Sequence, residues 1–182
     1  MDEYYLRDYD VERDIDCFHW LRSDSHTMRF FGMDAISSIA DSKKLMMDYI
    51  EAMANGECFR KVICCKDGNF VGEIGLNRIS TKHHRANAFS ILLPKYRHKG
   101  VSVCIARSFY GYVFNHLNIN RIQALVDTRN LDAINSLNNI GYKYEGILKQ
   151  YELEEDGFID IAVYALLKSD YIMQNDNVVL KV

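Results

Sequence analysis

At 182 residues and 48% hydrophobic, the chain is long enough for one globular domain with a sizeable core. The formal net charge of -3 argues against a broad nucleic-acid-binding surface, so a basic patch has to be local. No apolar run approaches the roughly 20 residues that span a bilayer, and the acidic start Met1-Asp2-Glu3-Tyr4 lacks the apolar region of a secretion signal.

Helical periodicity marks two segments in the first third of the chain. Apolar residues recur at helical spacing over residues 11–22 and again over 42–54, and Gly56 is a plausible stop for the second helix. Between them, Ser23 to Asp41 is irregular and rich in Ser, His and Phe. We expect that intervening stretch to be a mobile cover rather than part of the core.

Turn chemistry predicts two hairpins. Asp67-Gly68 separates strand-like runs over 59–65 and 70–77, and Asp156-Gly157 separates runs over 142–153 and 158–167. The remaining expected elements, in chain order, are a strand over 85–93, a helix over 100–117 buried on more than one face, a strand over 121–127 and a helix over 130–140. This order predicts a mixed α/β sheet in one domain, residues 1–172, with a tail over 173–182.

The five cysteines form no Cys-x-x-Cys pair and no zinc-site spacing, so no metal site is predicted. An odd number without a secretion signal indicates reduced thiols and a cytoplasmic protein. We expect Cys64 and Cys104 to act as small apolar core residues.

A basic loop connects the strand over 85–93 to the helix that follows it. The segment Tyr96–Ser102 contains Arg97, His98 and Lys99 before Gly100, and it opens a helical pattern. Backbone N–H groups at such a helix start are unsatisfied donors that favour an anion, and glycine lets the backbone approach a ligand closely. The loop fits neither a Walker motif nor a dinucleotide fingerprint. A phosphorylated ligand and an ordinary turn with solvated basic residues both remain open.

Three sequence blocks follow one another in the second half of the chain. They are Arg97–Ser102, Arg121–Asn130 and Ile140–Gly146, the last followed by Asp156–Asp160 and Tyr164. They match an Arg/Gln-x-x-Gly-x-Gly/Ala loop, a strand that ends in asparagine and a Gly-Phe-x-x-Glu-Gly pattern. In this order, they make nearly the whole chain resemble the GNAT N-acetyltransferases, most of all the RimJ/RimL branch, which acetylates ribosomal-protein N-termini.

The resemblance implies a fold and an activity. The fold is α/β, with a central mixed, mostly antiparallel sheet of six to seven strands, splayed at the fourth and fifth strands and flanked by about four helices. The activity is transfer of an acetyl group from acetyl-CoA to a primary amine of a protein N-terminus, a polyamine or a small molecule. The amine attacks the thioester directly, without a covalent enzyme intermediate. The family also implies a homodimer.

The resemblance also implies a cosubstrate site. The pyrophosphate of coenzyme A would lie over the basic loop, held mainly by backbone N–H groups, and the pantetheine arm would bond to the backbone of Ile91 and Leu92. The loop residues concerned are Arg97, His98, Lys99, Gly100, Val101 and Ser102. The N–H of Leu92 or a neighbour would polarise the thioester carbonyl. Asn130 would bond the pantetheine arm, cap the helix over 130–140, or do both.

The expected catalytic acid and base are missing from their family positions. Leu137 stands where many relatives have a tyrosine, Ala133 where the RimL type has a serine, and Asn87 where many have a glutamate. Candidate replacements are Glu73, Ser136 and His84. Each has an ordinary alternative: a solvated strand residue for Glu73, a surface helix residue for Ser136 and a solvated loop residue for His84.

Two other functions remain open. The missing acid and base also fit a non-catalytic acyl-CoA-binding regulatory module. A soluble α/β domain without a coenzyme A site is the third. The run His83-His84-Arg85 faintly resembles spermidine acetyltransferases, but a polycation needs a strongly acidic pocket, and the acidic residues cluster mostly at the tip of the second hairpin.

Overall fold

The computed structural model describes residues 4–154 and 156–174. Its elements are β1 (Tyr4–Arg7), α1 (Val11–Ser23), α2 (Ser25–Arg29), α3 (Ile39–Ala54), β2 (Phe59–Cys65), β3 (Phe70–Ser80), β4 (Arg85–Leu92), the 3-10 turn η1 (Pro94–Tyr96), α4 (Val101–His116), β5 (Arg121–Asp127), α5 (Leu131–Ile140), β6 (Lys143–Glu154), β7 (Gly157–Leu167) and α6 (Lys168–Gln174). Most of the expected tail, residues 173–182, lies outside the described residues. None of the described helices is long and apolar enough to cross a membrane.

Seven strands hydrogen-bond in the order β1-β2-β3-β4-β5-β7-β6. The sheet is mixed, as expected, because β4 and β5 are parallel while the β1–β2, β2–β3, β5–β7 and β6–β7 pairs are antiparallel. The parallel ladder is short: it joins Arg85–Asn87 to Arg121–Gln123, although β4 continues to Leu92 and β5 to Asp127. The expected interruption at the fourth and fifth strands is therefore confirmed.

Two compact units make up the chain. The first contains the residues up to Asn77 together with Phe89–Val101, and the second contains Arg78–Ala88 and the residues from Ser102 onward. Two of the three boundaries fall inside strands, β3 and β4, and the third falls at the first residue of α4, so none of them is a linker. Each unit is described by itself below.

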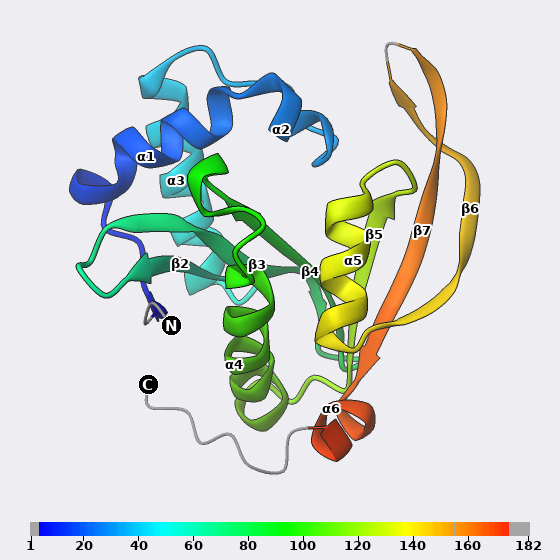
Figure 1. Ribbon diagram of the computed structural model, residues 1–182. Coiled ribbons are helices and arrows are strands. Elements are labelled where there is room, and N and C mark those ends of the chain that lie inside the picture. The colour runs from blue at the N-terminus through cyan, green and yellow to red at the C-terminus, as the bar shows by residue number, and fades with distance from the viewer. Residues whose placement is uncertain (1–3, 155, 175–182) are drawn as a thin grey trace. The chain divides into compact units, whose positions relative to one another are not determined.

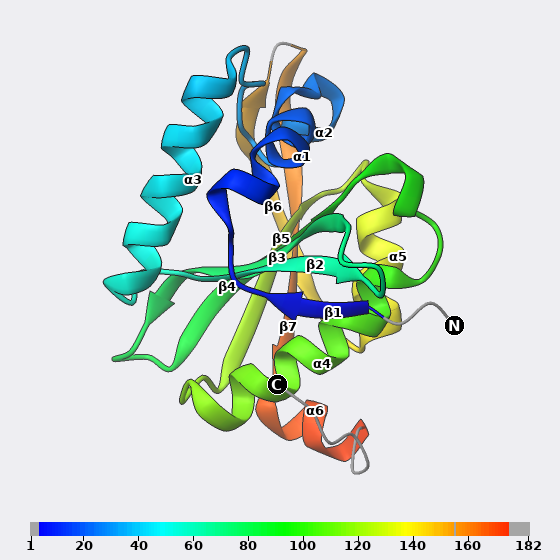
Figure 2. The same cartoon turned by 90° about the vertical axis from the view of Figure 1, so that its left-hand side faces the viewer.

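In the first unit, α1 and α2 lie over strands β2 and β3 (Figures 1 and 2). Its core combines residues from the helices, the strands and the segment after β4. The buried members are Leu21, Met28, Val62, Cys64, Phe70, Ile91 and Leu93. Phe18 of α1 meets the ring of Tyr49 of α3 edge to face, at 6.3 Å between centroids. The prediction for Cys64 is confirmed, since its side chain is fully buried.

The segment before α3 differs from its prediction. It contains α2, and Thr27 and Met28 of this helix are buried. Helix α3 also begins earlier than predicted, at Ile39, because Ser38 accepts a hydrogen bond from the Asp41 N–H and caps it. The α2 part of the segment thus contributes to the core, whereas residues 32–35 are exposed.

In the second unit, α4 is buried on more than one face, as predicted. Ile105, Phe109 and Val113 are buried along one side, and Tyr110 and Phe114 are buried beside them. Helix α5 lies alongside β5, and β6 and β7 form a long twisted hairpin (Figure 1). The prediction for Cys104 is wrong: it lies on α4 but its side chain is exposed. Helices α2 and α6 raise the described helices to six, where about four were expected.

Candidate active site

The basic loop takes the form that the sequence predicts: a strand, a tight turn and a helix start. After β4 and η1, the backbone passes through positive φ at His98 (57°) and Gly100 (76°) before α4 begins at Val101. A Cβ atom placed on Gly100 would meet nothing within 4 Å, so glycine is favoured here by backbone conformation and not by lack of space. Successive N–H groups in such a turn, followed by a helix start, form a concave donor site for an anion.

Arg97 is bound within its own unit. Its Nε donates to the carbonyl of Leu92 at 3.0 Å, and its Nη2 donates to the hydroxyl of Thr27 at 2.9 Å. The Thr27 hydroxyl in turn donates to the carboxylate of Asp24. Arg97 therefore fixes the start of the basic loop to the end of β4 and to α2. His98, Lys99 and Gly100 are the exposed residues of the loop.

The backbone groups of Ile91 and Leu92 face different neighbours. Leu93 donates its N–H to the carbonyl of Val71 on β3 at 2.9 Å, and a Cβ on Gly72 of β3 would overlap the carbonyl oxygen of Ile91. Because successive residues of a strand turn their backbone groups to opposite neighbours, Leu92 turns its N–H and carbonyl away from β3. Its carbonyl is occupied by Arg97. Leu92 also lies beyond the three-pair ladder between β4 and β5.

Glu73 is not a solvated strand residue. Its side chain is fully buried on β3, and it forms an ion pair with Arg22 of α1, which is 1% exposed. Its other carboxylate oxygen accepts a hydrogen bond from the hydroxyl of Tyr9. Burial and the nearby Glu73 charge raise the pKa of Tyr9 well above its usual value, so this phenol stays protonated and donates.

Arg22 is enclosed by aromatic and apolar groups. Its guanidinium carbon lies 5.0 Å from the centroid of the Phe18 ring, and its buried Nε has no hydrogen-bond partner among the described residues. Sequence analysis did not single out Arg22 or Tyr9. The only available signal was an arginine directly after Leu21, on the apolar side of a predicted helix.

The other sequence-predicted groups lie at helix α5 and on the turn before β4. Asn130 accepts a hydrogen bond at Oδ1 from the Ala133 N–H at 3.1 Å, which confirms its capping role. Ser136 and Leu137 are both half-buried on this helix. His84, on the turn before β4, bonds through Nδ1 to the carbonyl of Asn118 at 3.0 Å, which gives it a structural contact.

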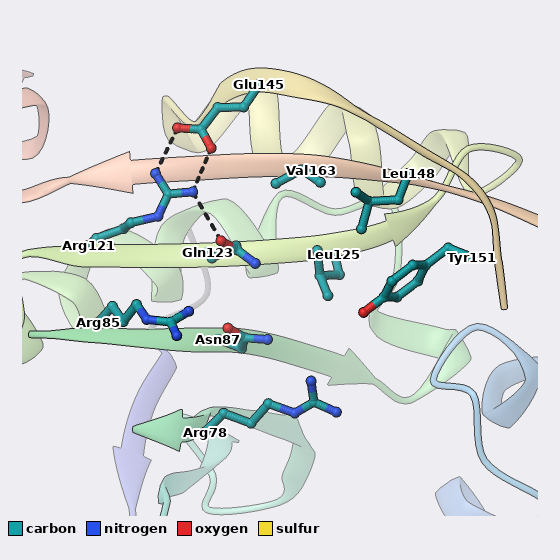
Figure 3. A pocket seen from close by; sticks show the side chains of 10 residues that line it. All are labelled: Arg78, Arg85, Asn87, Arg121, Gln123, Leu125, Glu145, Leu148, Tyr151 and Val163. Carbon is teal, nitrogen blue, oxygen red and sulfur yellow. Dashed lines mark hydrogen bonds and ion pairs between the residues drawn. The ribbon is translucent and has the colours of Figure 1, made fainter. Parts of the chain in front are cut away.

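A pocket of about 470 Å³ lies wholly within the second unit. It is lined by Arg78, Arg85, Asn87, Arg121, Gln123, Leu125, Glu145, Leu148, Tyr151 and Val163 (Figure 3). These residues come from β3, β4, β5, β6 and β7. Sequence analysis did not identify this pocket, because its arginines, Arg78, Arg85 and Arg121, do not form one sequence motif.

Comparison with known proteins then decides the family. The model of the acetyltransferase (GNAT) domain matches residues 4–143. The chain belongs to the GNAT acetyltransferase family. As a GNAT protein, it is an enzyme that transfers an acetyl group to an amine, with acetyl-CoA as cosubstrate. A non-catalytic binding module is not favoured.

Among curated GNAT relatives, the chain is 27% identical over 168 residues to the uncharacterized N-acetyltransferase p20 of Bacillus licheniformis, covering 91% of this chain and 93% of the relative. It is 27% identical over 135 residues to the spermidine N(1)-acetyltransferase of Escherichia coli K12, covering 74% and 70%. Its fold matches the crystal structure of the Vibrio cholerae spermidine N-acetyltransferase in complex with CoA and spermine, at a TM-score of 0.84 and 22% identity over 93% of this chain and 98% of the other.

Proposed function

We propose that acetyl transfer proceeds by direct attack of a primary amine on the acetyl-CoA thioester, with the Leu92 N–H polarising the carbonyl. The observation that carries this proposal is that Arg97 holds the Leu92 carbonyl while the next N–H, that of Leu93, donates to β3. The alternation of backbone groups along a strand then turns the Leu92 N–H away from β3. A backbone donor on a strand fixed in this way is preorganised, so it stabilises the developing oxyanion without reorganising. As the carbon–nitrogen bond forms, the carbon–sulfur bond breaks, and coenzyme A leaves as a thiolate.

For the rest of the cosubstrate, we propose the residues that the sequence indicated. The pyrophosphate binds the backbone N–H groups of the loop from Arg97 to Ser102, with charge from Lys99 and His98. The pantetheine arm bonds to the carbonyl of Leu92, which can accept a second hydrogen bond beside that from Arg97, in preference to the carbonyl of Ile91, which faces Gly72. Arg97 contributes by positioning the loop, since its guanidinium already has two partners.

Proton transfer is proposed to involve Glu73 and Ser136. The amine must lose a proton during the attack, and Glu73 is the carboxylate proposed to take it up. Because Arg22 engages one of its oxygens and Tyr9 the other, the proposed route of the proton to Glu73 is through the Tyr9 hydroxyl, which passes on its own proton and takes up that of the amine. The hydroxyl of Ser136 is the proposed donor to the leaving thiolate, a step that assists a leaving group already tolerable without an acid.

Binding of acetyl-CoA is expected to stabilise the protein, as is binding of coenzyme A. At 100 times its Kd, either ligand should add about 2.7 kcal/mol to the free energy of unfolding, which raises the Tm of a chain of this size by about 5–10 °C. A thermal-shift series with acetyl-CoA, coenzyme A and free ADP measures this. Thiol release with a panel of amines on the same sample then measures turnover. No shift with any of the three would contradict the cosubstrate site, and binding without turnover of any amine would contradict the enzyme.

The matched control uses two glycines in the same unit. Gly56 and Gly100 both have positive φ, 74° and 76°, and a Cβ on either would meet nothing within 4 Å. Gly56→Ala and Gly100→Ala should therefore cost similar backbone strain, about 1 kcal/mol each. Only Gly100→Ala should also weaken the response to acetyl-CoA.

Asn130 allows a second test of the cosubstrate site. Asn130→Ser keeps an oxygen that caps α5, so stability should stay within a few tenths of a kcal/mol, whereas Asn130→Ala should lose about 1 kcal/mol. The serine lacks the amide donor, so one hydrogen bond to acetyl-CoA is lost. The Kd for acetyl-CoA should therefore rise about fivefold. Calorimetric titration of both variants checks this. An unchanged Kd for Asn130→Ser would assign Asn130 to capping alone.

We also propose the finer classification that the three sequence blocks indicate, the RimJ/RimL type, with a protein N-terminus, a polyamine or a small amine as acceptor. A cytoplasmic location is proposed on the five free thiols, of which Cys104 is exposed. A homodimer and the absence of nucleic-acid partners are proposed on the family resemblance and on the net charge of -3.

A further inference from the structure

The pocket of the second unit presents side chains from one face of neighbouring strands. Arg85 and Asn87 of β4 are in register with Arg121 and Gln123 of β5. Because alternate residues of a strand share a face, these four side chains and that of Leu125 project to the same side. Figure 3 shows Arg78 reaching toward this group from the end of β3, and Tyr151 with its hydroxyl turned toward the pocket.

One arginine of the pocket is already neutralised. Arg121 donates to both carboxylate oxygens of Glu145, at 2.7 and 2.5 Å, and also to Oε1 of Gln123 at 3.0 Å. The Arg121 guanidinium lowers the pKa of Glu145, so the carboxylate remains ionised and the pair cancels in charge. Glu145 is the only acidic residue among those that line the pocket.

The other two arginines have no counterion in the part of the chain that the structure describes. Arg78 and Arg85 are exposed, and neither forms an ion pair or a side-chain hydrogen bond with a described residue. Arginine stays charged at all relevant pH values and presents a donor fork that fits carboxylate and phosphate. The pocket also offers the amide of Asn87 and the hydroxyl of Tyr151. It is therefore a donor-rich, positively charged site without a free carboxylate.

We propose that this pocket binds an anionic group of the acceptor, so that the enzyme acetylates small amines that also carry a carboxylate or a phosphate. The inference rests on the proposed function and concerns its acceptor. A polyamine would place further positive charges beside Arg78 and Arg85, and like charges brought together at a binding surface disfavour the complex. The acceptor class thus differs from that named for the spermidine acetyltransferase relatives.

The test compares four primary amines as acceptors: 4-aminobutanoate, 2-aminoethyl phosphate, butylamine and spermidine. We expect kcat/KM for one of the two anionic amines to be at least ten times that for butylamine. The ratio of this value to kcat/KM for spermidine should be larger still. The better of the two identifies the anion as carboxylate or phosphate. A preference for spermidine or for butylamine would overturn the proposal.

Two variants assign the preference to the pocket. Arg78→Gln and Arg85→Gln should each raise KM for the preferred anionic amine about tenfold, and change kcat/KM for butylamine by a much smaller factor. Lys82→Gln is the matched control, since Lys82 is an exposed cation on the turn between β3 and β4 that does not line the pocket. Equal effects of all three variants would show that the loss of any positive charge weakens binding, and this would overturn the proposal.

A binding measurement separates failure of the pocket from failure of the proposed function. Calorimetric titration with 4-aminobutanoate and 2-aminoethyl phosphate needs no turnover. If either compound binds the unsubstituted protein and does not bind Arg85→Gln, the anion site in the pocket is supported, even if no amine is acetylated. If neither compound binds although other amines turn over, the acetyltransferase stands and the anionic acceptor is refuted.

Discussion

Arg22→Met is expected to lower the free energy of unfolding by about 3–5 kcal/mol, because it leaves the Glu73 carboxylate buried without its counterion. Tyr9 alone then balances that charge by a hydrogen bond. Urea unfolding at neutral pH measures the change. The double variant Arg22→Met with Glu73→Leu should recover much of the loss, since a buried ion pair replaced by apolar groups of similar volume is often neutral.

An exposed ion pair provides the control for this result. Lys61 and Asp8 are 2.6 Å apart, with the Asp8 side chain 78% exposed, so Lys61→Met should cost less than about 1 kcal/mol. A loss of similar size in Lys61→Met and Arg22→Met would show that burial does not set the energy of the Arg22–Glu73 pair.

The same pair gives a test of catalysis. Glu73→Gln keeps the shape of the side chain and a hydrogen-bond acceptor for Tyr9, but it cannot take up the proton of the amine. If Glu73 is the base, kcat per folded molecule should fall at least a hundredfold, within the usual range for general base catalysis. An unchanged kcat in a destabilised but folded variant would restrict Glu73 to a structural role.

Gly72→Ala is the second change for which a large effect is expected. Its Cβ would overlap the carbonyl oxygen of Ile91 and lie 2.9 Å from the Cα of Leu92, so the backbone of β4 has to shift. Overpacking of this kind costs about 1–3 kcal/mol, and more where backbone is the obstacle. Because the shift falls on the proposed oxyanion donor, kcat should drop at least tenfold in the folded fraction.

Gly75 on the same strand is the matched comparison. A Cβ there would lie 2.6 Å from the Phe89 ring and 2.7 Å from the carbonyl of Phe59, so Gly75→Ala should also be destabilising. The nearest atoms to this Cβ belong to Phe89 and Phe59 and not to Leu92. Comparable losses of stability in urea, with a loss of kcat confined to Gly72→Ala, are expected. Equal losses of kcat in both variants would argue against a specific role of Leu92.

The sequence predicts well what local patterns encode. Strand β5, Arg121–Asp127, has the predicted boundaries, and α1, α4 and α5 begin or end within one residue of theirs. Asn130 was identified as a cap because capping depends on neighbours three residues away. Helix α2 was missed because its five residues are too few to establish a period, and Met28 is buried by residues distant in the chain.

The candidate site was predicted less completely, because its interactions are long-range. The loop up to Ser102 is one segment and was recognisable as such. Glu73 is 51 residues from Arg22, and nothing near either residue in the sequence indicates their pairing. The arginines of the pocket become neighbours through the register of Arg85 with Arg121. Such register follows from the sheet order, which local periodicity does not determine.

The proposed roles give strand β4 two kinds of specificity along its length. Near its start, Arg85 and Asn87 offer side chains to the pocket, whereas at its end Leu92 offers main-chain groups. Recognition by main chain tolerates substitution, while recognition by side chain changes with each substitution. Divergence within the family can therefore alter the acceptor while the acetyl donor stays the same. A chain 27% identical to its relatives can share their reaction and still differ from them in what it modifies.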